Sequence, residues 1–70
     1  MPENNELTKE QKIAIINQEI EFWKRSSFQM SLRVKVAIKI SDKQMEESAK
    51  AEMIKYEAAI ELLKEEITKL

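Results

Sequence analysis

The chain contains no cysteine, no histidine and no glycine, and it has a single proline among its 70 residues. Without cysteine and histidine there is no disulfide framework, no thiolate nucleophile and no zinc site of the usual ligand types. The commonest general base at neutral pH is also missing, which leaves carboxylates, lysines and Tyr56 for proton transfer. A glycine-rich phosphate loop is excluded because it needs backbone that a Cβ would block. We therefore predict no catalytic residue, no metal site and no cofactor, and we do not expect an enzyme.

Long apolar runs are missing too. No stretch approaches the ~20 residues that span a bilayer, and residues 1–6 lack the basic region and apolar run of a signal peptide. We expect a cytoplasmic protein with no membrane partner. Hydrophobic residues make up 43% of the chain, which is too many for a disordered tail. A chain of this length forms one domain, near the lower size limit for a self-sufficient core.

Charge is unevenly distributed along the chain, although the formal net charge is only −1. Residues 1–21 carry a net charge of −3, residues 24–43 carry +5 and residues 44–70 carry −3. The simplest expectation is self-neutralisation, either by pairing with a second copy of the chain or by folding back, so that the basic residues pair with acids of the last segment. Those acids are Glu46, Glu47, Glu52 and Glu57. Duplex nucleic acid is not an expected partner, because the sequence pI is about 5.5 and no reading motif is present.

The basic middle segment also offers a candidate site for an anion. An indole or phenyl face can stack on a base, and arginine grips phosphate through two hydrogen bonds. Such a site would bind a nucleotide-like or other anionic small ligand. The simpler interpretation is that Trp23 belongs to the core. The candidate residues are Trp23, Lys24, Arg25, Arg33, Lys35 and Lys39.

Two capping boxes predict two helices. The first is Thr8-Lys9-Glu10-Gln11, which follows a polar segment, 1–7, that we expect to be a flexible lead-in. The second is Ser41-Asp42-Lys43-Gln44. After it, apolar residues recur at a spacing of four and three, which is typical of a helix with one apolar stripe. These residues are Ala49, Met53, Tyr56, Ile60, Leu63, Ile67 and Leu70.

The segment 28–40 permits two interpretations, because every second residue in it is apolar. Strict alternation is typical of a strand, and a helix–strand–helix chain with 28–40 as an intermolecular strand is the alternative. A continuous helix is favoured because no Gly or Pro interrupts it and a lone strand needs another chain to pair with. We predict an all-α hairpin over 8–70, with a helix at 8–40, a turn near 41 and a helix at 42–69. Antiparallel folding about Ser41 places Trp23 opposite Ala59 and Ile60.

Placed on a helix, the apolar residues of 28–40 point to nearly all sides, and one neighbouring helix cannot cover them all. Leaving several exposed would forfeit a few kcal/mol, comparable with the stability of a domain this small. We expect a homo-oligomeric bundle, a dimer being favoured; the alternative is a monomer with a groove for a different protein. The residues of this oligomer or partner interface are Phe28, Met30, Leu32, Val34, Val36, Ile38 and Ile40.

The segment from Ile20-Glu21-Phe22-Trp23-Lys24-Arg25 through Val36-Ala37-Ile38-Lys39-Ile40-Ser41-Asp42, followed by a Glu/Lys-rich arm, resembles the small helical-hairpin proteins of tailed bacteriophages. The resemblance covers about residues 8–70. It implies an accessory protein that acts by binding a larger host protein, including inhibition of a host enzyme or defence component. The leading hypothesis is thus a non-enzymatic interaction protein. The alternatives are an oligomer that sequesters a nucleotide or other anionic ligand, and a structural component of a larger assembly.

Overall fold

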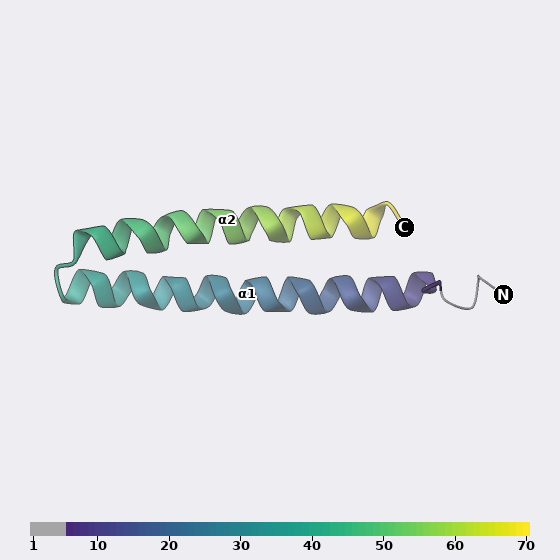
Figure 1. The fold of residues 1–70 in the computed structure, drawn as a ribbon, viewed down its shortest axis with the longest axis horizontal. Coiled ribbons are helices and arrows are strands. Elements are labelled where there is room, and N and C mark those ends of the chain that lie inside the picture. The colour runs from purple at the N-terminus through teal and green to yellow at the C-terminus, as the bar shows by residue number, and fades with distance from the viewer. Residues whose placement is uncertain (1–5) are drawn as a thin grey trace.

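The computed structural model describes residues 6–70 and consists of two antiparallel α-helices (Figure 1). Helix α1 spans Lys9–Lys39 and helix α2 spans Lys43–Thr68. The shorter helix α2 lies beside α1 along its whole length, while the first turn of α1 extends beyond it, and the molecule is a rod of 59 × 16 × 15 Å. Its radius of gyration is 16.9 Å, whereas a compact domain of this length has about 11 Å. The predicted helical hairpin is confirmed.

Helix α1 begins at the predicted capping box. The Gln11 backbone N–H donates to Thr8 Oγ1 at 3.1 Å, and the Thr8 backbone N–H donates to Gln11 Oε1 at 2.8 Å. These two bonds satisfy donors that the first helical turn cannot pair internally. Of the predicted flexible lead-in, residues 1–5 lie outside the described residues, whereas Glu6 and Leu7 are exposed and precede the helix.

Helix α1 runs without interruption through residues 28–39, so the alternative with a strand over 28–40 is wrong. Two serines at its centre bond back to the helix instead of breaking it. Ser26 Oγ donates to the Phe22 carbonyl at 3.0 Å, and Ser31 Oγ donates to the Phe28 carbonyl at 2.6 Å. The helix stays continuous because this segment contains no Gly or Pro. The local bonds pair the hydroxyls of Ser26 and Ser31 within it.

The turn between the helices is a Schellman motif built without glycine. The Asp42 N–H donates to the Ala37 carbonyl at 2.8 Å, and the Ser41 N–H donates to the Ile38 carbonyl at 3.2 Å. This pattern requires a left-handed residue after the helix, and Ser41 has φ 59°. Such a conformation costs a residue with a Cβ about 1 kcal/mol.

The second capping box was predicted one residue too early. Ser41 is not the N-cap of α2; Asp42 is, and its side chain accepts from the Met45 N–H at 3.0 Å. An N-cap residue is extended, as Asp42 is at φ −99° and ψ 92°, whereas Ser41 is held left-handed by the turn. Ser41 therefore ends α1 in the left-handed conformation, and Asp42 is the N-cap with which α2 begins.

The seam between the helices is narrow. Only Ile20, Ala37 and Ala49 are buried, and no large side chain is completely enclosed within the described chain. The predicted stripe of α2 lies in this seam, except Leu70, which is 39% exposed. The half-buried apolar residues that complete the seam are Ile13, Ile16, Trp23, Met30, Val34, Met45, Met53, Tyr56, Ala59, Ile60, Leu63 and Ile67.

Replacing Ser41 by glycine should stabilise the hairpin, because glycine adopts φ > 0 without the Cβ penalty. We expect the Ser41→Gly variant to unfold with a free energy higher by about 0.5–1 kcal/mol in urea denaturation. The matched control is Ser48→Gly in the interior of α2, which should lose about 0.5 kcal/mol. A loss of stability in both variants would contradict the turn geometry.

Candidate interaction faces

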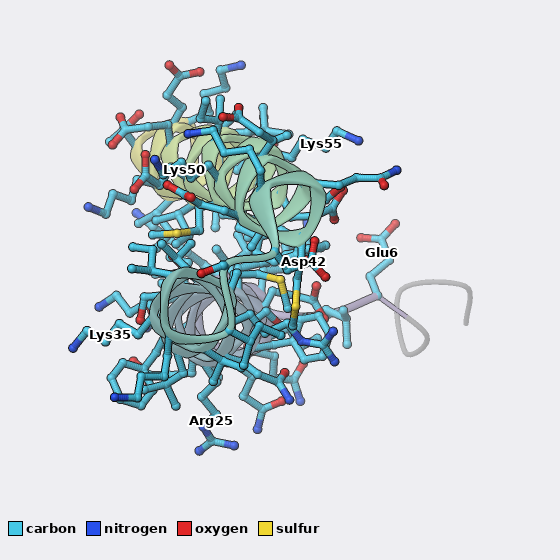
Figure 2. The ribbon with its side chains drawn as sticks, turned by 90° about the vertical axis from the view of Figure 1, so that its left-hand side faces the viewer. Glu6, Arg25, Lys35, Asp42, Lys50 and Lys55 are labelled. Atoms are coloured by element: carbon cyan, nitrogen blue, oxygen red, sulfur yellow. The ribbon has the colours of Figure 1, made fainter. Side chains whose placement is uncertain are left out.

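The side of α1 opposite α2 carries a row of exposed apolar side chains, which we call the outer stripe. Its residues recur at spacings of seven, six, four and four, so that they share one broad side of the helix, with Phe22 and Phe28 toward its two edges. They are Ile15, 47% exposed; Phe22, 56%; Phe28, 65%; Leu32, 44%; and Val36, 49%. Arg25 belongs to the same side and points away from α2 in the end view (Figure 2).

The predicted interface set over 28–40 divides between two sides of α1. Met30 and Val34 are half-buried, and Met30 lines a small hollow with Met45 and Ala49 of α2. These two residues therefore belong to the seam and not to an outward surface. The remaining five, Phe28, Leu32, Val36, Ile38 and Ile40, are 44–65% exposed. Over residues 28–36 the division arises because alternate residues of a helix point to nearly opposite sides. Ile38 is on the same side as Val34 but stays exposed beside the turn, where it lines a hollow with Ser41 and Lys43.

Trp23 lies in the seam, as the simpler interpretation expected. Its ring centroid is 5.3 Å from that of Tyr56 and 5.1 Å from that of Phe22, the latter edge to face. The residue of α2 that contacts Trp23 is thus Tyr56, about one helical turn before the expected Ala59 and Ile60. Two long side chains span that offset and pack against each other.

The six residues proposed for an anion do not surround one hollow. Trp23 faces α2, whereas Arg25 is turned away from it, and Arg33 lines the small hollow beside Met30 and Glu52. Lys24 lies 3.9 Å from Glu21 on its own helix. Lys35 and Lys39 are exposed. The structure therefore places these side chains on several sides of α1.

The expected pairing of α1 cations with α2 acids is wrong. Every ion pair found within residues 6–70 joins residues three or four apart on one helix. Glu46, for example, holds Lys50 at 2.8 Å, and Glu52 holds Lys55 at 3.3 Å. Lysines one turn away reach these carboxylates first. The cations without an ion pair in this part of the chain include Arg25, Arg33, Lys35 and Lys39.

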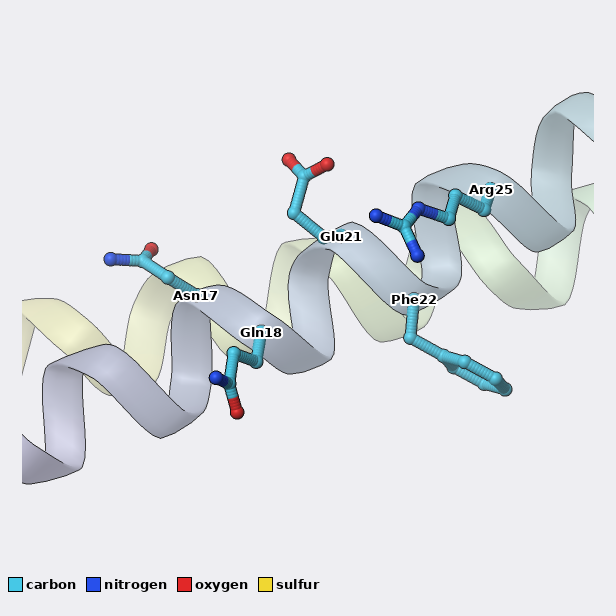
Figure 3. Close-up of a pocket in the computed structure, with 5 residues that line it drawn as sticks. All are labelled: Asn17, Gln18, Glu21, Phe22 and Arg25. Carbon is cyan, nitrogen blue, oxygen red and sulfur yellow. The ribbon is translucent and has the colours of Figure 1, made fainter.

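A hollow with a volume of about 370 Å³ lies on the outer side of α1 (Figure 3). All of its lining residues come from this one helix, so it is an open groove and not an enclosed pocket. Glu21 and Arg25 lie on one side of the ribbon, and Gln18 and Phe22 lie on the other. A small ligand would be covered on one side only, whereas a ligand site normally buries most of the ligand's surface.

The pKa values of Glu46, Glu52 and Tyr56 in α2 are shifted away from neutrality. The hydrogen bond from Lys50 lowers the pKa of Glu46, and the Tyr56 hydroxyl, followed by Lys55, lowers the pKa of Glu52. The Glu52 carboxylate in turn raises the pKa of Tyr56. Proton transfer at neutral pH needs shifts in the opposite direction. Within residues 6–70 there is also no cluster of three or more candidate side chains placed to bind a metal ion.

A second outward strip, on α2, is absent from the sequence predictions. It consists of Ala51, Ile54, Ala58 and Leu62, and we call it the α2 strip. Ile54 is 68% exposed and Leu62 is 55% exposed. In the sequence these four apolar residues recur at spacings of three, four and four. The longer and more regular seam stripe of the same helix made this second pattern hard to recognise. The sequence predictions also lacked Ile15 and Phe22 of the outer stripe, because both lie outside the alternating segment 28–40, whose apolar pattern dominates α1.

Comparison with known proteins identifies no relative: no family model, curated protein or solved structure matches this chain. In the part of the chain that the structure describes, neither helix has an apolar stretch sufficient for crossing a lipid bilayer.

The stability that Glu46 contributes should depend on pH. Because its pKa is lowered in the folded state from 4.5, its contribution is present above that value and is lost as pH falls through the folded pKa. We expect Glu46→Gln to lower the melting temperature slightly at pH 7 and to match the unsubstituted chain near pH 2. Melting followed by circular dichroism measures both. Glu61→Gln, which removes no ion pair within residues 6–70, should show a nearly constant difference, and equal pH profiles for the two variants would contradict the pairing.

Proposed function

We propose that the protein is a non-enzymatic interaction protein that self-associates through the outer stripe of α1 and binds a larger protein through the α2 strip. The observation that carries the proposal is that the hairpin bears two exposed apolar strips, one on each helix and both outside the seam. Exposed single apolar residues are ordinary, but a row of five along one helix is typical of a surface that another protein covers.

The exposed area supports self-association. The chain exposes 5669 Å² to solvent, whereas a compact protein of 8.2 kDa exposes about 4,500 Å². The excess is about 1,200 Å², and a standard protein interface buries about 800 Å² on each partner. Covering the outer stripe by association would therefore bring the exposed area into the ordinary range.

The two strips differ in a way that supports different roles. The outer stripe has two phenylalanines and three aliphatic residues along most of α1, which suits a permanent interface. The α2 strip is shorter and includes two alanines, with Glu57, Glu61 and Glu65 nearby on the same helix. A small apolar strip beside charged residues is typical of interfaces that form and dissociate. The resemblance to phage hairpin proteins supports a larger host protein as the partner and inhibition by occupation of its surface.

The roles of the two strips can be separated with matched double variants. Phe28→Glu/Leu32→Glu should convert the oligomer to an 8.2 kDa monomer, because the introduced charges cannot be buried unpaired. Ile54→Glu/Leu62→Glu should leave the oligomer intact. Size-exclusion chromatography with light scattering measures both, and circular dichroism verifies that helix content is kept, since all four positions are exposed.

The same variants test partner binding. A tagged chain should retain a protein in stoichiometric amount from a lysate of the cells in which the gene occurs, and the α2 variant should lose it by at least tenfold. Retention that is unaffected by Ile54→Glu/Leu62→Glu would contradict the role of the α2 strip. A monomeric unsubstituted chain would contradict self-association.

A further inference from the structure

We infer that the outer stripe of α1 is covered by the same stripe of a second copy, packed antiparallel about a two-fold axis close to Arg25. The inference rests on the self-association proposed above and specifies its geometry. Because the outer stripe lies opposite the seam, the four helices would lie in a row, with the two α1 helices inside and the two α2 helices outside. Two observations carry the inference: the spacing of the stripe and the charges beside it.

The spacing of the outer stripe is nearly symmetric about its middle. In an antiparallel pair with its axis near Arg25, residues face each other when their numbers add up to about 50. This register brings Ile15 opposite Val36 of the second copy and Phe22 opposite Phe28 of the second copy. Ile15 and Phe22 at one end of the stripe thus each meet a large apolar residue from the other end. Leu32 meets Gln18, whose exposed side chain lines the surface hollow (Figure 3).

Aromatic contacts would sit on both sides of the axis. Phe22 and Phe28 are the two most exposed members of the stripe, at 56% and 65%. Because they are six residues apart, they lie toward opposite edges of the stripe. The register brings Phe22 of each copy level with Phe28 of the other copy across the middle of the interface, and this occurs twice per dimer. Aromatic pairs of this kind dominate interface energetics because they bury a large area with few rotatable bonds.

The charges along α1 favour the antiparallel arrangement over a parallel one. Residues 24–39 carry five cations and no acid, whereas residues 9–21 carry three glutamates and two lysines. Parallel packing would place the two basic segments against each other. Antiparallel packing places each basic segment beside the acidic segment of the second copy, which is the complementary arrangement.

The same register also aligns charges that have no ion pair within residues 6–70. Glu19 comes level with Arg33 of the second copy on one edge of α1, the flank on which Arg33 also lines the hollow shared with α2. Glu10 comes beside Lys39 of the second copy on the other edge. In a two-fold antiparallel pair, residues on the same edge of the two helices are neighbours, and both pairs satisfy this condition. The charge pairs on the two edges therefore predict nearly the same register as the apolar residues between them.

Arg25 would meet its own copy near the axis, where two guanidinium groups repel each other. Glu21 lies one turn away on each chain and lines the same hollow as Arg25 (Figure 3). At the axis, each guanidinium is therefore close to a carboxylate. The hollow is the space that the second copy fills.

Cysteine cross-linking tests this geometry directly, because the chain has no cysteine of its own. Arg25→Cys should form a disulfide-linked dimer almost completely on mild oxidation, since facing residues near the axis come within disulfide distance. The matched control is Gln18→Cys, exposed on the same side of α1 and seven residues away. Its two copies would be separated by about 20 Å along the helices and should not link. A mixture of Gln18→Cys with Leu32→Cys should link only between the two different chains.

Each outcome has a distinct meaning. Linking of Arg25→Cys and of the mixture, without linking of Gln18→Cys alone, supports the inference. Equal linking of Arg25→Cys and Gln18→Cys would show parallel packing and overturn it. An oligomer that links at none of these positions would overturn the inference and leave self-association intact, whereas an 8.2 kDa particle for every variant and for the unsubstituted chain would overturn both.

Discussion

The structure is governed by the fact that two helices share only one seam, while α1 is apolar on two sides. The seam takes up Ile20, Trp23 and the residues in register with them, and nothing on α2 reaches the opposite side of α1. Burial of a Leu, Val or Phe side chain contributes roughly 1.5–3 kcal/mol, which is large compared with the net stability of a small domain. The outer stripe is therefore the feature on which the proposed assembly, and with it the proposed function, rests.

Polar interactions shape the hairpin without joining its helices. The capping box at Thr8, the back-bonded serines and the N-cap at Asp42 are all local, and the ion pairs of the described chain each lie within one helix. Local bonds of this kind fix where helices begin and end. They leave the cations of α1 free of acids on α2, so charge complementarity becomes available to a second molecule.

Much of the fold could be predicted from local patterns. The capping box at Thr8 and the heptad-like stripe from Ala49 to Ile67 each depend on residues one or two turns apart, and the structure has both. The position of the second N-cap could not be predicted in this way, because Ser41 and Asp42 are both good N-cap residues and the Schellman turn decides between them. The predicted salt bridges between the helices are not formed within residues 6–70, for a related reason. The net charge of a segment does not say on which side of the helix each charged residue lies. The predicted interface set mixed two sides of α1, since alternation grouped Met30 and Val34 with the exposed residues although helical geometry turns them into the seam.

The central claim is that the fold is completed by a second copy, and the concentration dependence of thermal unfolding tests it most directly. When folding is coupled to association, mass action makes the melting temperature rise with protein concentration. We predict such a rise between low and high micromolar concentrations, measured by circular dichroism at 222 nm. A cooperative transition whose midpoint stays the same across that range would contradict the account.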